Sequence, residues 1–85
     1  MPKPNPVLKA TILEVVDNQL RDGIPPETKQ TFERLPAQGH SAAEAKRLIG
    51  AVVASEIFNV LKRKEPYNQA RFVAALRRLP KVPDE

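Results

Sequence analysis

The sequence predicts an all-α protein of four helices, and two observations carry that prediction. Apolar residues recur at the three- and four-residue spacing of helix faces, and no segment alternates apolar and polar residues as a half-buried strand does. Proline and glycine then divide the 85-residue chain into segments of helical length. The expected helices span residues 7–22, 26–38, 42–63 and 69–79, within a single domain over residues 1–85.

Proline and glycine set the limits of the first two helices. Three prolines are expected to keep residues 1–6 as an extended arm, since each disfavours a helical conformation of the residue before it. Gly23 is expected to end the first helix in the left-handed conformation. Pro26 suits the first turn of the second helix, where its missing N–H is not needed, and Gly39 closes that helix.

Capping signals mark the starts of the last two helices. Ser41–Glu44 matches a capping box, in which the serine hydroxyl and the glutamate side chain each satisfy a backbone N–H. Asn68 is the predicted N-cap of the fourth helix, and Tyr67 and Phe72 have the spacing of a hydrophobic staple. Residues 80–85 are expected to fray.

The third helix carries two apolar stripes instead of one. The core-facing stripe is made of Ala45, Ile49, Val52, Val53 and Val60. The second stripe lies roughly 120° away. It is made of Gly50, Ala54, Ile57 and Leu61, with Phe58 just beyond. A helix that is apolar on most sides must be covered on most sides, either by the other three helices or by another chain.

The second stripe is therefore the predicted interaction surface, for a second copy of the chain first and for another protein otherwise. Gly50 costs the helix about 1 kcal/mol relative to alanine, so we expect another helix to pack closely on it. That helix belongs either to the same chain or to a partner, and the sequence leaves both open.

Glu56 lies inside the core-facing stripe, and Gln19 has a similar place on the first helix. A buried carboxylate must pair, take a proton or reach solvent. Arg71 and Lys9 are the expected partners of Glu56, and Gln19 is a further one. A structural pair is favoured over a catalytic acid, because no histidine, cysteine or second acid accompanies Glu56.

The net charge of +4 is concentrated in the second half of the chain. Residues 62–81 hold seven basic side chains and one acidic one. One interpretation is a nucleic-acid-binding module, and its candidate phosphate contacts are Arg63, Lys64, Arg71, Arg77 and Arg78. The other is that bases gather at helix C-termini, where the helix dipole favours them, and this one is preferred.

The residues argue against an enzyme, so no catalytic, cofactor-binding or metal-binding residue is expected. Without cysteine there is no disulfide, thiolate metal site or cysteine nucleophile. The three glycines lie too far apart for a phosphate-binding loop. Ser41 is engaged as a cap beside the lone histidine, His40, and a turn position suits that histidine. With neither a signal peptide nor a membrane span in the sequence, a cytoplasmic location is expected.

Two stretches of the sequence carry three resemblances to known proteins. Residues 35–48 resemble the first loop of a ubiquitin-associated domain and also a helix-turn-helix, but the third helix is too long for the former and Pro36 interrupts the latter. A longer pattern resembles small bacterial helical proteins of unknown function, and it joins Val15–Leu20, Pro25–Thr28, Phe32–Leu35, Gly39 and Glu44–Ala45. That resemblance implies a bacterial, intracellular, all-α protein and no particular activity. Some of these proteins carry histidines on the first and third helices, which this chain lacks, so a metal role does not carry over.

Overall fold

The computed structural model describes residues 6–83, with side chains from Leu8 onward, as four α-helices. They are α1 (Pro6–Asp22), α2 (Pro26–Ala37), α3 (Ala42–Arg63) and α4 (Gln69–Arg78). The all-α prediction with a long third helix is confirmed. The first helix begins one residue earlier than predicted. The second and fourth helices end one residue earlier than predicted, because Gln38 and Leu79 are C-caps and not helical residues.

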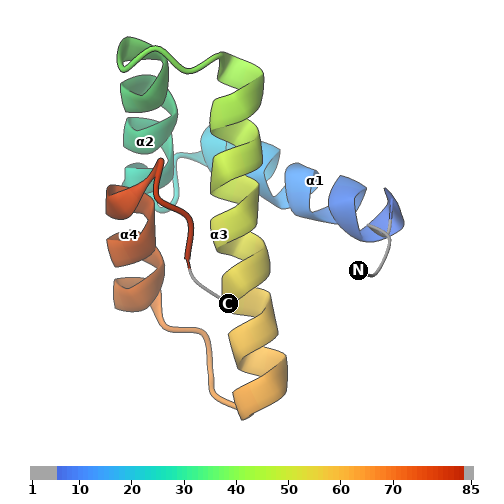
Figure 1. Cartoon of the computed structure of the whole chain (residues 1–85). Coiled ribbons are helices and arrows are strands. Elements are labelled where there is room, and N and C mark those ends of the chain that lie inside the picture. Colours follow the sequence, from blue (N-terminus) through green and yellow to red (C-terminus); the bar gives the residue numbers. More distant parts are fainter. Residues whose placement is uncertain (1–5, 84–85) are drawn as a thin grey trace.

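The long helix α3 organises the molecule, and the other helices are arranged around it (Figure 1). The helices α2 and α4 lie one beyond the other along one side of α3, while α1 crosses behind it. The N-terminal half of α1 extends past α3, and the segment after α4 turns back toward α3. The whole measures 35 × 28 × 24 Å, so the roughly 30 Å length of α3 spans the long dimension.

All four helices contribute to one core. Its fully buried members are Val16, Leu35, Ala45, Ile49, Val52, Val53, Phe72, Leu76 and Leu79. The predicted core face of the third helix is confirmed, with Val60 half-buried at its end. The first helix is buried only in part, because α1 crosses α3 instead of running along it: Val16 is buried, whereas Leu8 is 51% exposed.

The cap of α3 differs from the predicted capping box in one half. The Ser41 hydroxyl accepts a hydrogen bond from the Glu44 backbone N–H at 3.0 Å, as predicted. The Glu44 carboxylate contacts Nδ1 of His40 in place of the Ser41 backbone N–H. The histidine is thus held by Glu44 at the turn before α3.

The cap of α4 agrees with its prediction. Asn68 Oδ1 accepts from the Arg71 backbone N–H at 3.0 Å. The rings of Tyr67 and Phe72 pack with their centroids 6.0 Å apart, which is the predicted hydrophobic staple. These local contacts fix the direction in which the chain enters α4 after the short connection over residues 64–68.

The predicted extended arm and frayed tail lie partly outside the described residues, because the arm includes residues 1–5 and the tail includes residues 84–85. Pro6, the last residue of the predicted extended arm, begins α1 instead, since a proline at the first helical position gives up no helical hydrogen bond. At the other end, Val82 and Pro83 line a pocket together with residues of α3.

Candidate functional site

Glu56 and Arg71 form the strongest polar contact between α3 and α4. Arg71 Nε donates to one oxygen of Glu56 at 2.9 Å and Nη2 to the other at 2.6 Å. The predicted pairing is therefore confirmed, and Glu56 is 6% exposed. The hydrogen bonds from Arg71 lower the pKa of the Glu56 carboxyl, and burial opposes them. Glu65 accepts a third bond from Arg71 at 3.2 Å, and the two carboxylates together raise the guanidinium pKa.

The other predicted partners of Glu56 lie elsewhere. Gln19 is half-buried and accepts a hydrogen bond from the Thr28 hydroxyl at 3.0 Å, which ties α1 to α2. The prediction of a buried Gln19 against Glu56 is wrong, because the end of α1 packs toward α2. Lys9 is exposed and lies on the N-terminal half of α1, which extends past the core (Figure 1).

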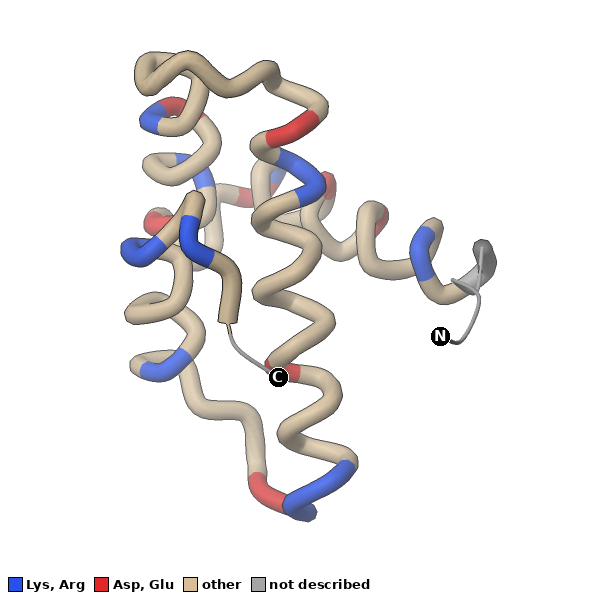
Figure 2. The backbone as a smooth tube through the Cα atoms, viewed as in Figure 1, with Lys and Arg blue, Asp and Glu red and all other residues tan. Residues whose placement is uncertain are grey.

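The exposed basic residues of the 62–81 segment gather at the ends of α3 and α4, and two of them, Arg63 and Arg78, line one hollow. Arg63 and Lys64 lie at the end of α3, whereas Arg77 and Arg78 lie at the opposite end of α4 (Figure 2). All four are exposed, while Arg71 is engaged by two carboxylates. A hollow of about 350 Å³ between α3 and α4 is lined by Arg63, Arg71 and Arg78, with Glu56 among them. One of these three arginines is thus already neutralised.

The second apolar stripe of α3 is largely uncovered in its C-terminal half. Ile57, Phe58 and Leu61 are 37%, 61% and 73% exposed, and Ala54 beside them is half-buried. The reason is geometric, because α1 crosses α3 nearer its N-terminal end while α2 and α4 pack on the other side. The apolar spacing predicted that this stripe is covered by other helices or by another chain. Within one copy of the chain, much of it stays exposed to solvent.

Gly50 is the exception among the predicted interaction residues. It is buried beneath α1, and a Cβ atom at this position would lie 3.3 Å from Ile12 Cγ2 and 3.9 Å from Leu13 Cδ2. The close approach expected at this glycine is therefore made by a helix of the same chain. Gly50 belongs to the α1–α3 contact and not to the exposed surface.

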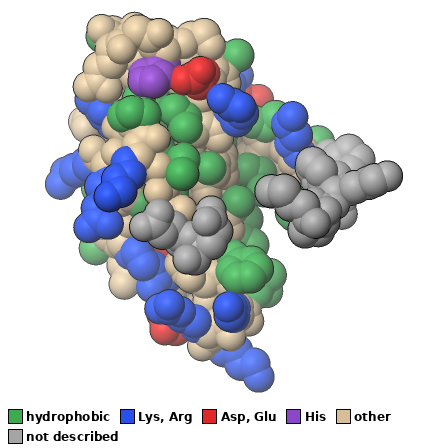
Figure 3. Space-filling view, in the orientation of Figure 1, with side chains coloured by type: hydrophobic (Ala, Val, Ile, Leu, Met, Phe, Trp, Pro, Cys, Tyr) green, Lys and Arg blue, Asp and Glu red, His purple; other side chains and the backbone are tan. Residues whose placement is uncertain are grey.

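Two pockets adjoin along the exposed side of α3, and we call them together the α3 groove. Its floor is formed by Ala51, Ala54 and Phe58. The larger pocket holds about 680 Å³ and has Val82 and Pro83 as one wall. A second pocket of about 420 Å³ meets it at Ala51, and α1 lines that pocket through Leu8, Ile12 and Leu13. Figure 3 shows apolar side chains over this part of the surface with basic ones around them.

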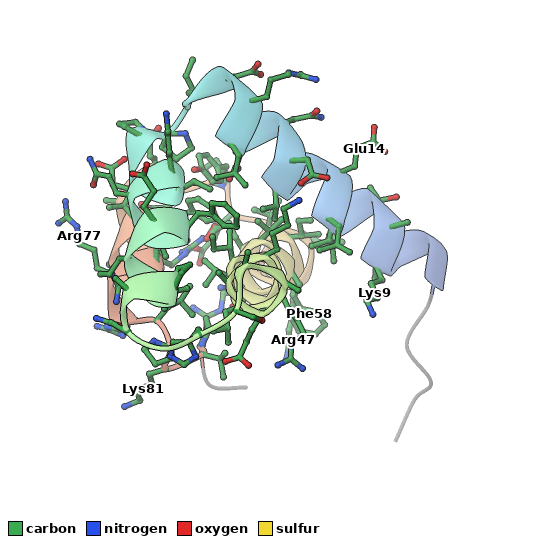
Figure 4. All side chains as sticks on the ribbon, turned by 90° about the horizontal axis from the view of Figure 1, so that it is seen from above. Lys9, Glu14, Arg47, Phe58, Arg77 and Lys81 are labelled. Atoms are coloured by element: carbon green, nitrogen blue, oxygen red, sulfur yellow. The ribbon has the colours of Figure 1, made fainter. Side chains whose placement is uncertain are left out.

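Every charged residue that lines these two pockets within the described chain is basic. Lys62 and Arg63 lie at one end, and Arg47 and Lys9 lie at the other. The Lys62 ammonium lies 5.5 Å from the centre of the Phe58 ring, within the range of a cation–π contact. Lys9, Arg47 and Phe58 point to the same side of the molecule, away from Glu14 (Figure 4).

Two structural features were missed from the sequence. Arg34 of α2 donates to the backbone carbonyls of Leu76 and Leu79 at 3.1 and 2.9 Å, and so it caps the end of α4. Its spacing on α2 carried no signal for this role. The wall made by Val82 and Pro83 was also missed, because a short non-helical segment has no periodicity that reveals its neighbours.

The structure offers little acid–base or metal chemistry. Between Pro6 and Pro83 no three histidine or carboxylate side chains gather where they could hold a metal ion. Glu56, the most buried carboxylate of that part, already accepts two hydrogen bonds from Arg71. None of the described helices is both long and apolar enough to cross a membrane. Comparison of the chain with protein-family models, with curated proteins and with solved structures gives no match.

Proposed function

We propose that this is a non-enzymatic binding protein that holds another polypeptide against the exposed side of α3. The observation that carries the proposal is the exposure of Phe58 and Leu61 beside the α3 groove. A contiguous apolar surface with polar residues at its edge is typical of a protein-binding site. Burying one such large side chain is worth about 1.5–3 kcal/mol, so two of them provide a binding hot spot.

Two occupants fit this proposal, namely a second copy of the chain and a different protein. Sedimentation velocity between about 1 and 100 µM separates them, because a homodimer that relies on this face dissociates on dilution. Phe58→Ala should then shift the equilibrium toward monomer. Ile24→Ala is the matched control, since Ile24 is 72% exposed and lies outside the groove.

A photoreactive phenylalanine analogue at position 58, expressed in the source cells, tests the proposal for either occupant. We expect an adduct with a defined protein, or with the same chain, that an analogue at position 24 does not give. The partner is then purified and titrated with wild type and Phe58→Ala, which should bind at least about tenfold more weakly. Equal adducts from both positions, or equal affinities in the titration, would contradict the proposal.

Nucleic-acid binding is the second candidate, supported by the exposed bases Arg63, Lys64, Arg77 and Arg78. It ranks lower because Arg71, which lines the hollow together with Arg63 and Arg78, is already paired with Glu56 and Glu65. Titration with duplex and single-stranded DNA at two salt concentrations decides it. Absence of salt-dependent binding below about 100 µM removes this candidate, since non-specific binders reach that affinity.

A further inference from the structure

We infer that the α3 groove takes an acidic amphipathic helix from a different protein, and that a second copy of this chain is not its occupant. The inference rests on the proposed binding function and adds the chemistry of the partner. Three features support it: the shape of the groove, the basic residues at its two ends, and the regular spacing of apolar and basic groove residues along α3.

The shape of the groove suits a helix. Its floor is low because Ala51 and Ala54 have small side chains, which lets a partner backbone approach α3 closely. Residues of α1 line the pocket nearer the N-terminal end of α3, and Val82 and Pro83 line the pocket nearer its C-terminal end. An apolar groove along a helix is a surface on which an amphipathic helix can lay its apolar face.

The groove residues on α3 follow one helical stripe. Arg47, Ala51, Ala54, Phe58 and Lys62 are spaced by four, three, four and four residues, so they lie on the same side of the helix. The distance from Arg47 to Lys62 along the axis is about 22 Å at 1.5 Å per residue. A partner helix of about four turns therefore places its two ends against the two basic ends of the groove.

The charges decide between the two occupants. Among the described residues, the four charged ones that line the groove, Lys9, Arg47, Lys62 and Arg63, are all basic. In a symmetric pair of chains, each copy would present the same basic ends to the other, whether the two α3 helices ran parallel or antiparallel. Like charges brought together at an interface oppose binding. A helix with glutamate or aspartate at its flanks instead meets these four bases with opposite charge.

The partner chemistry follows from this arrangement. Its apolar residues recur at i, i+3 or i+4 and i+7, so that they meet the alanine floor and the Phe58 ring. Acidic side chains flank that stripe at both ends, within reach of Arg47 and Lys62. Because these contacts are exposed at the rim, they contribute more to partner choice and to the association rate than to affinity.

Fluorescence anisotropy with synthetic peptides tests the inference on the purified full chain. The probe is a labelled amphipathic peptide of about 18 residues with a leucine stripe and glutamates at both ends. One comparison peptide carries lysines in place of the glutamates, and another has the glutamate composition in scrambled order. We expect the glutamate peptide to bind at least about tenfold more tightly than either, and to weaken as salt rises from about 50 to 300 mM.

Matched variants locate the site. Arg47→Glu combined with Lys62→Glu should weaken the glutamate peptide and strengthen the lysine peptide. Lys29→Glu combined with Arg77→Glu changes the net charge equally away from the groove and should alter neither. All four substituted side chains are exposed or half-exposed on helices, and circular dichroism verifies that each variant keeps its helical content.

The outcomes separate this inference from the proposed function. If the glutamate and lysine peptides bind equally well and Phe58→Ala weakens both, the inference of an acidic partner is overturned. The apolar groove would still be a binding site in that case. A dimer that dissociates in Phe58→Ala also overturns the inference, because a second copy then occupies the face. No binding of any peptide overturns the inference by itself, and the photoreactive residue at position 58 independently tests the proposed function.

Discussion

Arg71 of α4 binds the carboxylate of Glu56 on α3 through two hydrogen bonds, donated by Nε at 2.9 Å and by Nη2 at 2.6 Å. This pair joins the C-terminal half of the long helix to the helix that follows it. The same guanidinium reaches Glu65 in the connection between them. One arginine thus holds a buried carboxylate, an exposed carboxylate and the start of α4 together.

Replacing Glu56 with glutamine should lower the free energy of unfolding by about 1–2 kcal/mol at pH 7. The amide keeps the size of the side chain but removes the charge that Arg71 binds. The loss is moderate because Arg71 is partly exposed and water screens the pair. Urea denaturation measures it. Glu65→Gln is the control and should cost less than about 0.5 kcal/mol, since that carboxylate is exposed. Equal losses in the two variants would contradict a special role for Glu56.

The Glu56 pair should also make stability depend on pH in the acidic range. The Glu56 pKa is lowered in the folded protein, so the unfolded chain takes up the proton first as the pH falls. The stabilisation is therefore complete above about pH 4.3, the ordinary glutamate value, and is lost as the pH falls through the folded pKa. Unfolding free energies of wild type and Glu56→Gln should differ at pH 7 and converge in acid. A constant difference down to about pH 2.5 would be inconsistent with this pair.

The sequence identified Glu56 as buried and named Arg71 among its candidate partners, but it also named Lys9 and Gln19, which lie elsewhere. A helical wheel shows which face of a helix is buried, and it placed Glu56 among core residues correctly. It does not show which neighbouring helix covers that face. Gln19 bonds to Thr28 because α1 turns toward α2 at its end, and that direction depends on tertiary packing.

The exposed surface was likewise predicted in part. The spacing of Ile57, Phe58 and Leu61 indicated an apolar stripe apart from the core. How much of that stripe stays exposed depends on where α1 crosses α3, and Gly50 fixes that crossing by admitting Ile12. The four helices and their caps follow from local signals, whereas the crossing position and the wall at Val82 depend on contacts between distant residues.

Gly50 should tolerate little added volume. Alanine there gains up to about 1 kcal/mol of helix propensity but places its Cβ 3.3 Å from Ile12 Cγ2, so Gly50→Ala should be nearly neutral. Gly50→Val adds branches that push α1 away and should cost about 1–3 kcal/mol. Ala54→Val, one turn along on the open side of α3, is the control and should cost only the smaller propensity difference. Similar losses for both valine variants in thermal unfolding would show that α1 does not pack on Gly50.

Arg34 should stabilise the end of α4 from outside that helix. Its guanidinium donates to the carbonyls of Leu76 and Leu79 at the C-terminal end of α4, where carbonyls lack the next helical turn. The Leu76 carbonyl also accepts the Leu79 backbone N–H at 3.2 Å, so Arg34 adds a second bond there. Arg34→Met keeps the aliphatic stem and removes both bonds, so we expect a loss of about 1–3 kcal/mol. Arg77→Met is the matched control, because Arg77 is exposed at the same end of α4. Hydrogen exchange should show faster opening of α4 in the first variant only. Unchanged protection of α4 in Arg34→Met would mean that water satisfies these carbonyls equally well.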